Sequence, residues 1–140
     1  MATSLRPELS ERNPYWIERH RYYELKHFCL QYPIWKKALL ELEKNGMSKG
    51  STDISGIRSG NISDPTAECV AACEKYRKRM ELVELTAQGV SFDLGDYILT
   101  GVTEGLSYDN LAKRYDIPCC KDVYYNLYRK FFWLLDMRRD

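Results

Sequence analysis

The chain has 140 residues, a formal net charge of +1, 44% hydrophobic residues and 13% aromatic residues. This length suits one domain with at most an appendage, and the hydrophobic content excludes a disordered chain. No apolar run approaches the roughly 20 residues that a membrane-spanning helix needs, and residues 1–12 lack the apolar region of an export signal. We therefore expect a cytoplasmic protein with no membrane partner, in which any basic patch is local. The odd number of cysteines, five, predicts thiols in a reducing compartment rather than a disulfide framework.

The first 44 residues predict two helical segments. Asn13-Pro14 is typical of a helix start, and Tyr22, Leu25 and Phe28 then recur at helical spacing. Tyr32-Pro33 should kink or break this helix, because proline lacks an N–H donor and crowds the preceding turn. A second helical piece should follow and end at Asn45-Gly46.

A polar segment and a long helix come next. Residues 45–63 contain four glycines and five serines with few large apolar residues, which predicts a flexible linker. Asp64-Pro65 then resembles a helix start, and the amphipathic pattern continues until Gly89. Residues 64–140 should therefore hold a long helix followed by a C-terminal domain.

The final third predicts three shorter helices, at about 93–103, 108–115 and 121–138. Gly105 separates the first two, and Asp116-Ile117-Pro118 separates the last two. No alternating strand pattern of useful length occurs, so the expected fold class is all-α. We expect a helical bundle with two long N-terminal helical segments, a flexible linker and a C-terminal helix-turn-helix.

The last two predicted helices carry the functional hypothesis. A short helix, a turn and a longer helix outline a helix-turn-helix, in which Ala112 would be the small residue and Ile117 the apolar plug. Helical spacing then predicts a core stripe on the last helix of Val123, Leu127, Phe131 and Leu134. The remaining face would contact the major groove of double-stranded DNA, with cations neutralising phosphates. The predicted DNA-binding residues are Lys113, Arg114, Lys121, Tyr125, Tyr128 and Arg129.

Nearly the whole chain resembles the phage and prophage transcriptional activators of the RinA and ArpU type. The order of parts carries the resemblance, from ELKHFCLQYPIWKKALLELE through a polar segment to DPTAECVAACEKYRKRMELVE, DYILTGVTEGLSYDNLAKRYDIP and KDVYYNLYRKFFWLLDMRR. The resemblance implies a terminal unit similar to sigma-factor region 4, with residues 121–130 as the recognition helix. It also implies an activator of late operons in a bacterial host, with bacterial RNA polymerase as a further partner.

Two rival functions fit the same layout. One is a phage protein-binding inhibitor or adaptor that uses the aromatic surface of this scaffold, since fold does not fix function. The other is a terminase-like DNA-packaging component that binds DNA as an oligomeric ring.

Aromatic residues beyond the expected core stripe predict self-association. Phe132 lies almost opposite that stripe and Trp133 lies well off it, so either the N-terminal helices or a second subunit must cover them. We expect a homodimer. The expected oligomer or partner interface comprises Trp16, Trp35, Phe132 and Trp133.

We find no catalytic set, so the chain is not expected to be an enzyme and needs no cofactor or small-molecule substrate. Carboxylates are spread along the helices as surface charge, and no glycine-rich phosphate loop follows a strand. Cys69 and Cys73 lie one helical turn apart, yet their place near an apolar stripe favours a structural role over metal binding. Cys119-Cys120 precedes a predicted helix, whose dipole could lower a thiol pKa and make a redox role conceivable.

Overall fold

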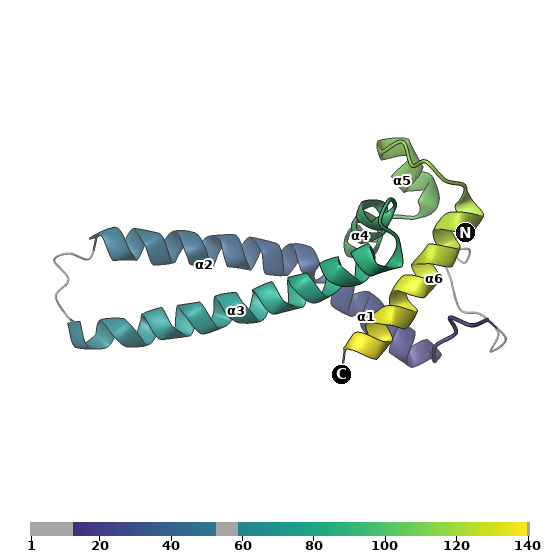
Figure 1. Cartoon of the computed structure of the whole chain (residues 1–140). Coiled ribbons are helices and arrows are strands. Elements are labelled where there is room, and N and C mark those ends of the chain that lie inside the picture. The colour runs from purple at the N-terminus through teal and green to yellow at the C-terminus, as the bar shows by residue number, and fades with distance from the viewer. Residues whose placement is uncertain (1–12, 53–58, 140) are drawn as a thin grey trace. The chain divides into compact units, whose positions relative to one another are not determined.

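A computed structural model describes residues 13–52 and 59–139, and all regular secondary structure in these two ranges is helical (Figure 1). The expected all-α class is therefore confirmed. The helices are α1 (Arg19–Leu30), α2 (Tyr32–Thr52), α3 (Ser59–Val90), α4 (Gly95–Glu104), α5 (Tyr108–Arg114) and α6 (Lys121–Arg138).

The chain divides into two compact units. The first unit combines Met1–Gln31 with Leu82–Asp140, and the second is the segment Tyr32–Glu81 between them. The division differs from the predicted boundaries at 44 and 64, because α1 belongs with the C-terminal helices and α2 pairs with α3.

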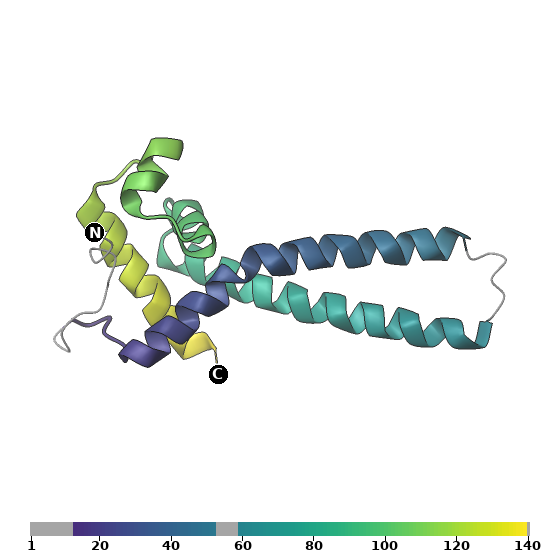
Figure 2. The same ribbon diagram turned by 180° about the vertical axis from the view of Figure 1, so that it is seen from behind.

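The second unit is an antiparallel helical hairpin of α2 and the first part of α3, whose ribbons run side by side in two opposite views (Figures 1 and 2). Trp35 is buried, and the guanidinium carbon of Arg79 lies 5.8 Å from its ring centroid. Cys69 donates from its thiol to the Leu42 carbonyl at 3.6 Å. This polar contact places Cys69 on the face of α3 that packs against α2.

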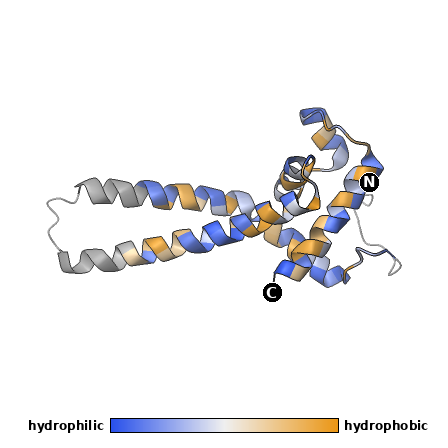
Figure 3. Ribbon diagram, in the orientation of Figure 1, coloured by the Kyte–Doolittle hydropathy of each residue, from blue (hydrophilic) through white to orange (hydrophobic). Residues whose placement is uncertain are grey.

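In the first unit, α1 contacts α4 and α6, and α4, α5 and α6 contact one another. Apolar and polar stretches alternate along α4 and α6, as expected for helices that bury one face (Figure 3). The fully buried large side chains of this unit come from five of its helical segments: Leu25, Cys29, Val83, Thr86, Ile98, Leu111, Tyr124, Phe131, Phe132 and Leu135.

The first helix begins later than predicted, at Arg19 instead of Asn13. Asn13 forms a turn in which its side chain accepts the Tyr15 N–H at 2.8 Å, and this turn satisfies donors that a helix would otherwise use. Glu18 caps α1 by accepting the His20 N–H at 3.1 Å. The predicted break at Tyr32-Pro33 is confirmed, because α1 ends at Leu30 and α2 begins at Tyr32.

The polar segment 45–63 contains more helix than predicted. α2 continues past Gly46 to Thr52, and α3 begins at Ser59, before the expected start at Asp64. A glycine inside a helix costs only about 1 kcal/mol relative to alanine, which pairing with a neighbouring helix offsets. Residues 53–58 of the expected linker lie outside the described residues.

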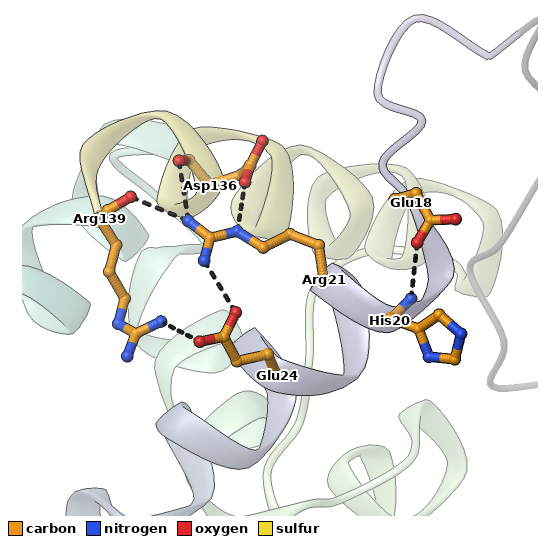
Figure 4. A network of polar contacts seen from close by, with 6 residues as sticks. All are labelled: Glu18, His20, Arg21, Glu24, Asp136 and Arg139. Atoms are coloured by element: carbon orange, nitrogen blue, oxygen red, sulfur yellow. Dashed lines mark hydrogen bonds and ion pairs between the residues drawn. The ribbon is translucent and has the colours of Figure 1, made fainter.

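The end of α6 is fixed to α1 by a network of arginines and carboxylates (Figure 4). Arg21 donates from Nε to Asp136 Oδ1 at 2.6 Å and from Nη2 to the Arg139 carbonyl at 2.9 Å. A cation that donates to the last carbonyls of a helix satisfies acceptors that have no helical partner and offsets the negative end of the dipole. Arg139 completes the network by donating to Glu24 at 3.2 Å.

This network predicts an acid-sensitive contribution to stability. Hydrogen bonds from Arg21 and then Arg139 lower the pKa of Glu24 below its ordinary value of 4.5. A carboxylate whose pKa is depressed by folding stabilises the fold above its unfolded pKa and loses that contribution as pH falls through the folded pKa. We expect Glu24→Gln to destabilise the protein at neutral pH and the difference from wild type to vanish with acidification below about pH 4.5.

Urea unfolding of both proteins from pH 7 to pH 3 measures this difference. Glu41→Gln, which removes an exposed carboxylate from the hairpin unit, is the matched control. A difference between wild type and Glu24→Gln that persists unchanged at pH 3 would contradict the prediction.

Candidate nucleic-acid interface

The junction between α5 and α6 is held by hydrogen bonds that join the starts of both helices. The Tyr125 hydroxyl accepts the Tyr108 N–H at 3.0 Å, and the Tyr108 hydroxyl donates to the Cys119 carbonyl at 2.6 Å. Ser107 caps α5 by accepting the Asn110 N–H at 3.2 Å. These contacts span the non-helical segment 115–120 and fix α6 relative to α5.

α4 and α6 meet at a glycine. A Cβ atom at Gly101 would lie 2.1 Å from the Tyr124 hydroxyl oxygen, so no larger residue fits there without displacement. Tyr124 is 1% exposed, and its hydroxyl has no hydrogen-bond partner in the described part of the chain. Burial accordingly raises the pKa of Tyr124 well above its ordinary value.

The buried face of α6 differs from the predicted stripe. Of the expected residues only Phe131 is buried, while Val123 is 44% exposed and Leu127 and Leu134 are half-buried. The prediction was wrong because the larger aromatic side chains bury more apolar area than valine or leucine and take the inner face. The buried residues of α6 are Tyr124, Tyr128, Phe131, Phe132 and Leu135.

Consequently, the predicted DNA-binding row on α6 does not lie opposite the core. Tyr128 is buried, and its hydroxyl lies 3.3 Å from the Tyr22 hydroxyl, so its predicted contact with DNA is wrong. Tyr125 is half-buried, with its hydroxyl committed to Tyr108. Arg129 is half-buried, and its Nε atom is enclosed without a partner among the residues that the structure covers.

The predicted cations of α5 and of the α6 start lie at the surface. Lys113 and Arg114 are in the last turn of α5, and Lys121 is the first residue of α6. Arg114 Nη1 lies 3.8 Å from Glu104 Oε1, and Lys121 Nζ lies 3.8 Å from Asp109 Oδ2. Ion pairs this long and exposed contribute little, so either cation can exchange its carboxylate for a phosphate at small cost.

The predicted interface residues divide between core and surface. Phe132 is 1% exposed because α1 covers it, with the Tyr22 ring centroid 5.2 Å away in an edge-on arrangement. Trp35, which belongs to the hairpin unit, is 2% exposed, so neither residue can serve as an interface. Trp133 is half-buried, with its ring centroid 5.4 Å from that of Tyr15, and Trp16 is exposed.

The sequence left open whether the N-terminal helices or a second subunit cover the aromatic residues beyond the expected core stripe. In the structure, helix α1 of the first unit covers Phe132. The aromatic excess on α6 is absorbed by α1 and gives no support for a dimer.

Sequence reasoning missed the face of α6 that is turned to solvent. Val123 and Asn126 are exposed and Lys130 is half-buried, at spacings of three and four. The sequence also offers the aromatic series Tyr124, Tyr128 and Phe131 at spacings of four and three, and burial of that series turns the other three residues to solvent.

Cys119 does not have the electrostatic environment expected of a reactive thiol. Burial raises the pKa of Cys119, contrary to the lowering that a helix dipole would cause. Among the described residues, no group of three or more His, Cys, Asp or Glu side chains is placed to hold a metal ion.

No protein-family model, curated protein or solved structure matches the chain. Among the helices that the structure describes, none combines the length and the apolar character needed to cross a membrane.

Proposed function

We propose that the chain is a DNA-binding transcriptional regulator of phage origin that places α6 in the major groove of double-stranded DNA. The observation that carries the proposal is the rigid α5–α6 junction, which leaves one long face of α6 uncovered and flanked by cations. A short helix that crosses the backbone and a longer helix whose start contacts base edges are the parts of a helix-turn-helix. We infer that α5 and α6 act as these two parts.

Charge around this junction supports a phosphate-binding role. Lys113, Arg114 and Lys121 lie at the surface on consecutive elements, and the N-terminus of α6 favours anions through its unsatisfied N–H groups. Arg138 and Arg139 do not add to this patch, because they contact Thr86 and Glu24 within the fold. The proposed DNA contact is thus carried by three or four cations, which predicts modest affinity per subunit.

We propose that the regulator works as a homodimer, as expected from the aromatic residues of the sequence, or together with RNA polymerase, as the family resemblance implies. Two subunits would double the number of phosphate contacts and present two recognition helices to a palindromic site. The analytical ultracentrifugation profile with and without DNA measures this stoichiometry.

One observation favours the adaptor function as the second candidate. Phe92 is 90% exposed and Leu85 is 55% exposed, although both belong to the first unit, which buries its other phenylalanines. Aromatic side chains are enriched at protein–protein interfaces, so an exposed phenylalanine suits a protein partner. A chain that fails to bind DNA but loses partner binding on Phe92→Ala would favour this candidate.

Salt-dependent DNA binding tests the proposed function. We expect fluorescence anisotropy to detect binding of a labelled duplex at about 50 mM salt, with affinity falling steeply as salt rises. Replacing Lys113 or Lys121 by alanine should weaken binding to all sequences and reduce the slope of log affinity against log salt by about 1.

Lys75→Ala and Lys78→Ala are matched controls, since both remove an exposed cation from α3 in the hairpin unit. They should leave the slope unchanged. An intact protein that shows no salt-dependent binding at about 50 mM salt would defeat the proposal, because even non-specific binders retain measurable affinity there.

A further inference from the structure

We infer that Val123, Asn126 and Lys130 form the sequence-reading row of α6, in which Asn126 binds adenine and Val123 contacts the methyl group of a thymine. This inference rests on the proposed function. It assigns recognition to residues other than the row Lys121, Tyr125 and Arg129 that the sequence favoured.

The burial pattern of α6 places this row opposite the core. Successive residues turn by about 100° around a helix, so residues at spacings of three and four share one face. The buried residues Tyr124, Tyr128 and Leu135 define the inner direction. Asn126 points almost directly away from them, with Val123 and Lys130 on the same outer face.

The neighbouring polar side chains are committed elsewhere. Tyr125 accepts the first N–H of α5, and Lys121 lies beside Asp109. Arg129 is half-buried with its Nε enclosed. Asp122 and Asn126 are therefore the exposed polar residues on the outer side of the first two turns of α6, and Asn126 is the uncharged one.

The chemistry of Asn126 matches one base. Its amide presents one acceptor and one donor side by side, and adenine presents N7 as an acceptor and N6 as a donor in the major groove. Val123 lies one turn earlier and is 44% exposed beside half-buried Leu127. This apolar surface is suited to the methyl group of thymine.

The charges at the two ends of the row set its direction. Asp122 is exposed in the first turn next to Val123 and would repel a phosphate there, which favours a base edge over the DNA backbone opposite Val123. Lys130 lies seven residues after Val123, or about 10 Å along the helix axis, where it can reach a phosphate. The row thus enters the groove at Val123 and leaves it at Lys130.

In vitro selection from a randomised duplex library tests the row with the full chain. We expect wild-type protein to select sites with adenine at one position, and Asn126→Ala to lose that preference by about tenfold while keeping its affinity for random DNA. Lys113→Ala is the matched control and should weaken all sequences alike. Because Asn126 is exposed, the thermal unfolding of the Asn126→Ala protein should match that of wild type.

Base analogues then identify the contacted atoms. Replacing the selected adenine by 7-deazaadenine removes N7, and replacing the adjacent thymine by deoxyuridine removes the methyl group. Each change should weaken wild-type binding, but 7-deazaadenine should have no further effect on Asn126→Ala and deoxyuridine none on Val123→Ala. Such a loss of additivity marks direct contact.

The outcomes separate the inference from the proposed function. A wild-type protein without salt-dependent DNA binding overturns both. A protein that binds DNA but selects no adenine, or whose adenine preference survives Asn126→Ala, overturns only the inference. If the selected preference is lost in Arg129→Ala instead, recognition belongs to the row that the sequence favoured, which contains Arg129. This outcome would likewise overturn the inference.

Discussion

Phe132→Ala is expected to lower the free energy of unfolding by about 3–5 kcal/mol, the usual cost of removing a buried phenyl ring. Phe132 is 1% exposed, and the ring centroids of Tyr22, Tyr128 and Phe131 lie 5.0–5.2 Å from its own. The cavity would open where α1 meets α6, so both helices should be destabilised and should unfold together. Urea unfolding followed by circular dichroism measures the loss.

Phe92→Ala provides a matched control, since it deletes the same side chain at a position that is 90% exposed. It should change stability by less than about 0.5 kcal/mol. Equal effects of the two substitutions would contradict the burial of Phe132. A Phe132→Ala protein that stays folded but loses a dimeric mass would instead restore this residue to an interface.

Gly101→Ala is expected to destabilise the first unit, with a loss of about 1–3 kcal/mol typical of overpacking. The new Cβ would lie 2.1 Å from the Tyr124 hydroxyl oxygen. The ring of Tyr124 is buried and contacts Tyr108, Tyr125 and Tyr128, so it cannot swing aside at low cost. The usual gain in helix propensity from glycine to alanine, about 1 kcal/mol, offsets only part of the cost of this clash.

Tyr124→Phe should rescue Gly101→Ala. Without the hydroxyl the nearest atom to the new Cβ becomes the Tyr124 Cζ carbon at 3.4 Å, an ordinary contact. Because the hydroxyl has no partner among the described residues, Tyr124→Phe alone should be close to neutral. A double-mutant cycle of thermal unfolding measures the coupling, and additive effects would show that the two residues do not collide.

The positions of the last three helices could be predicted from local signals. Gly105 adopts a left-handed conformation at the end of α4, with φ of 68°, and Ser107 caps α5. These residues act within one or two turns of their own position, so the sequence reveals them without knowledge of the fold. Asp116-Ile117-Pro118 similarly marked the segment between α5 and α6.

The face that α6 buries could not be predicted in the same way. Its pattern offers two apolar stripes one residue apart, and the choice between them depends on which helix lies alongside. That helix is α1, about a hundred residues earlier in the chain, and Arg21 and Tyr22 of α1 contact Asp136 and Tyr128 of α6. A pairing at such separation leaves no local signal in the sequence.

The insertion of the hairpin into the first unit also sets an order of events during synthesis. α1 leaves the ribosome before α4 and α6, which cover its apolar residues Tyr22, Leu25 and Phe28 and are made later. At typical synthesis rates α1 would wait on the order of ten seconds for α6. During that interval the nascent chain exposes an apolar surface of the kind that chaperones bind, and premature termination before α6 would leave that surface uncovered for good.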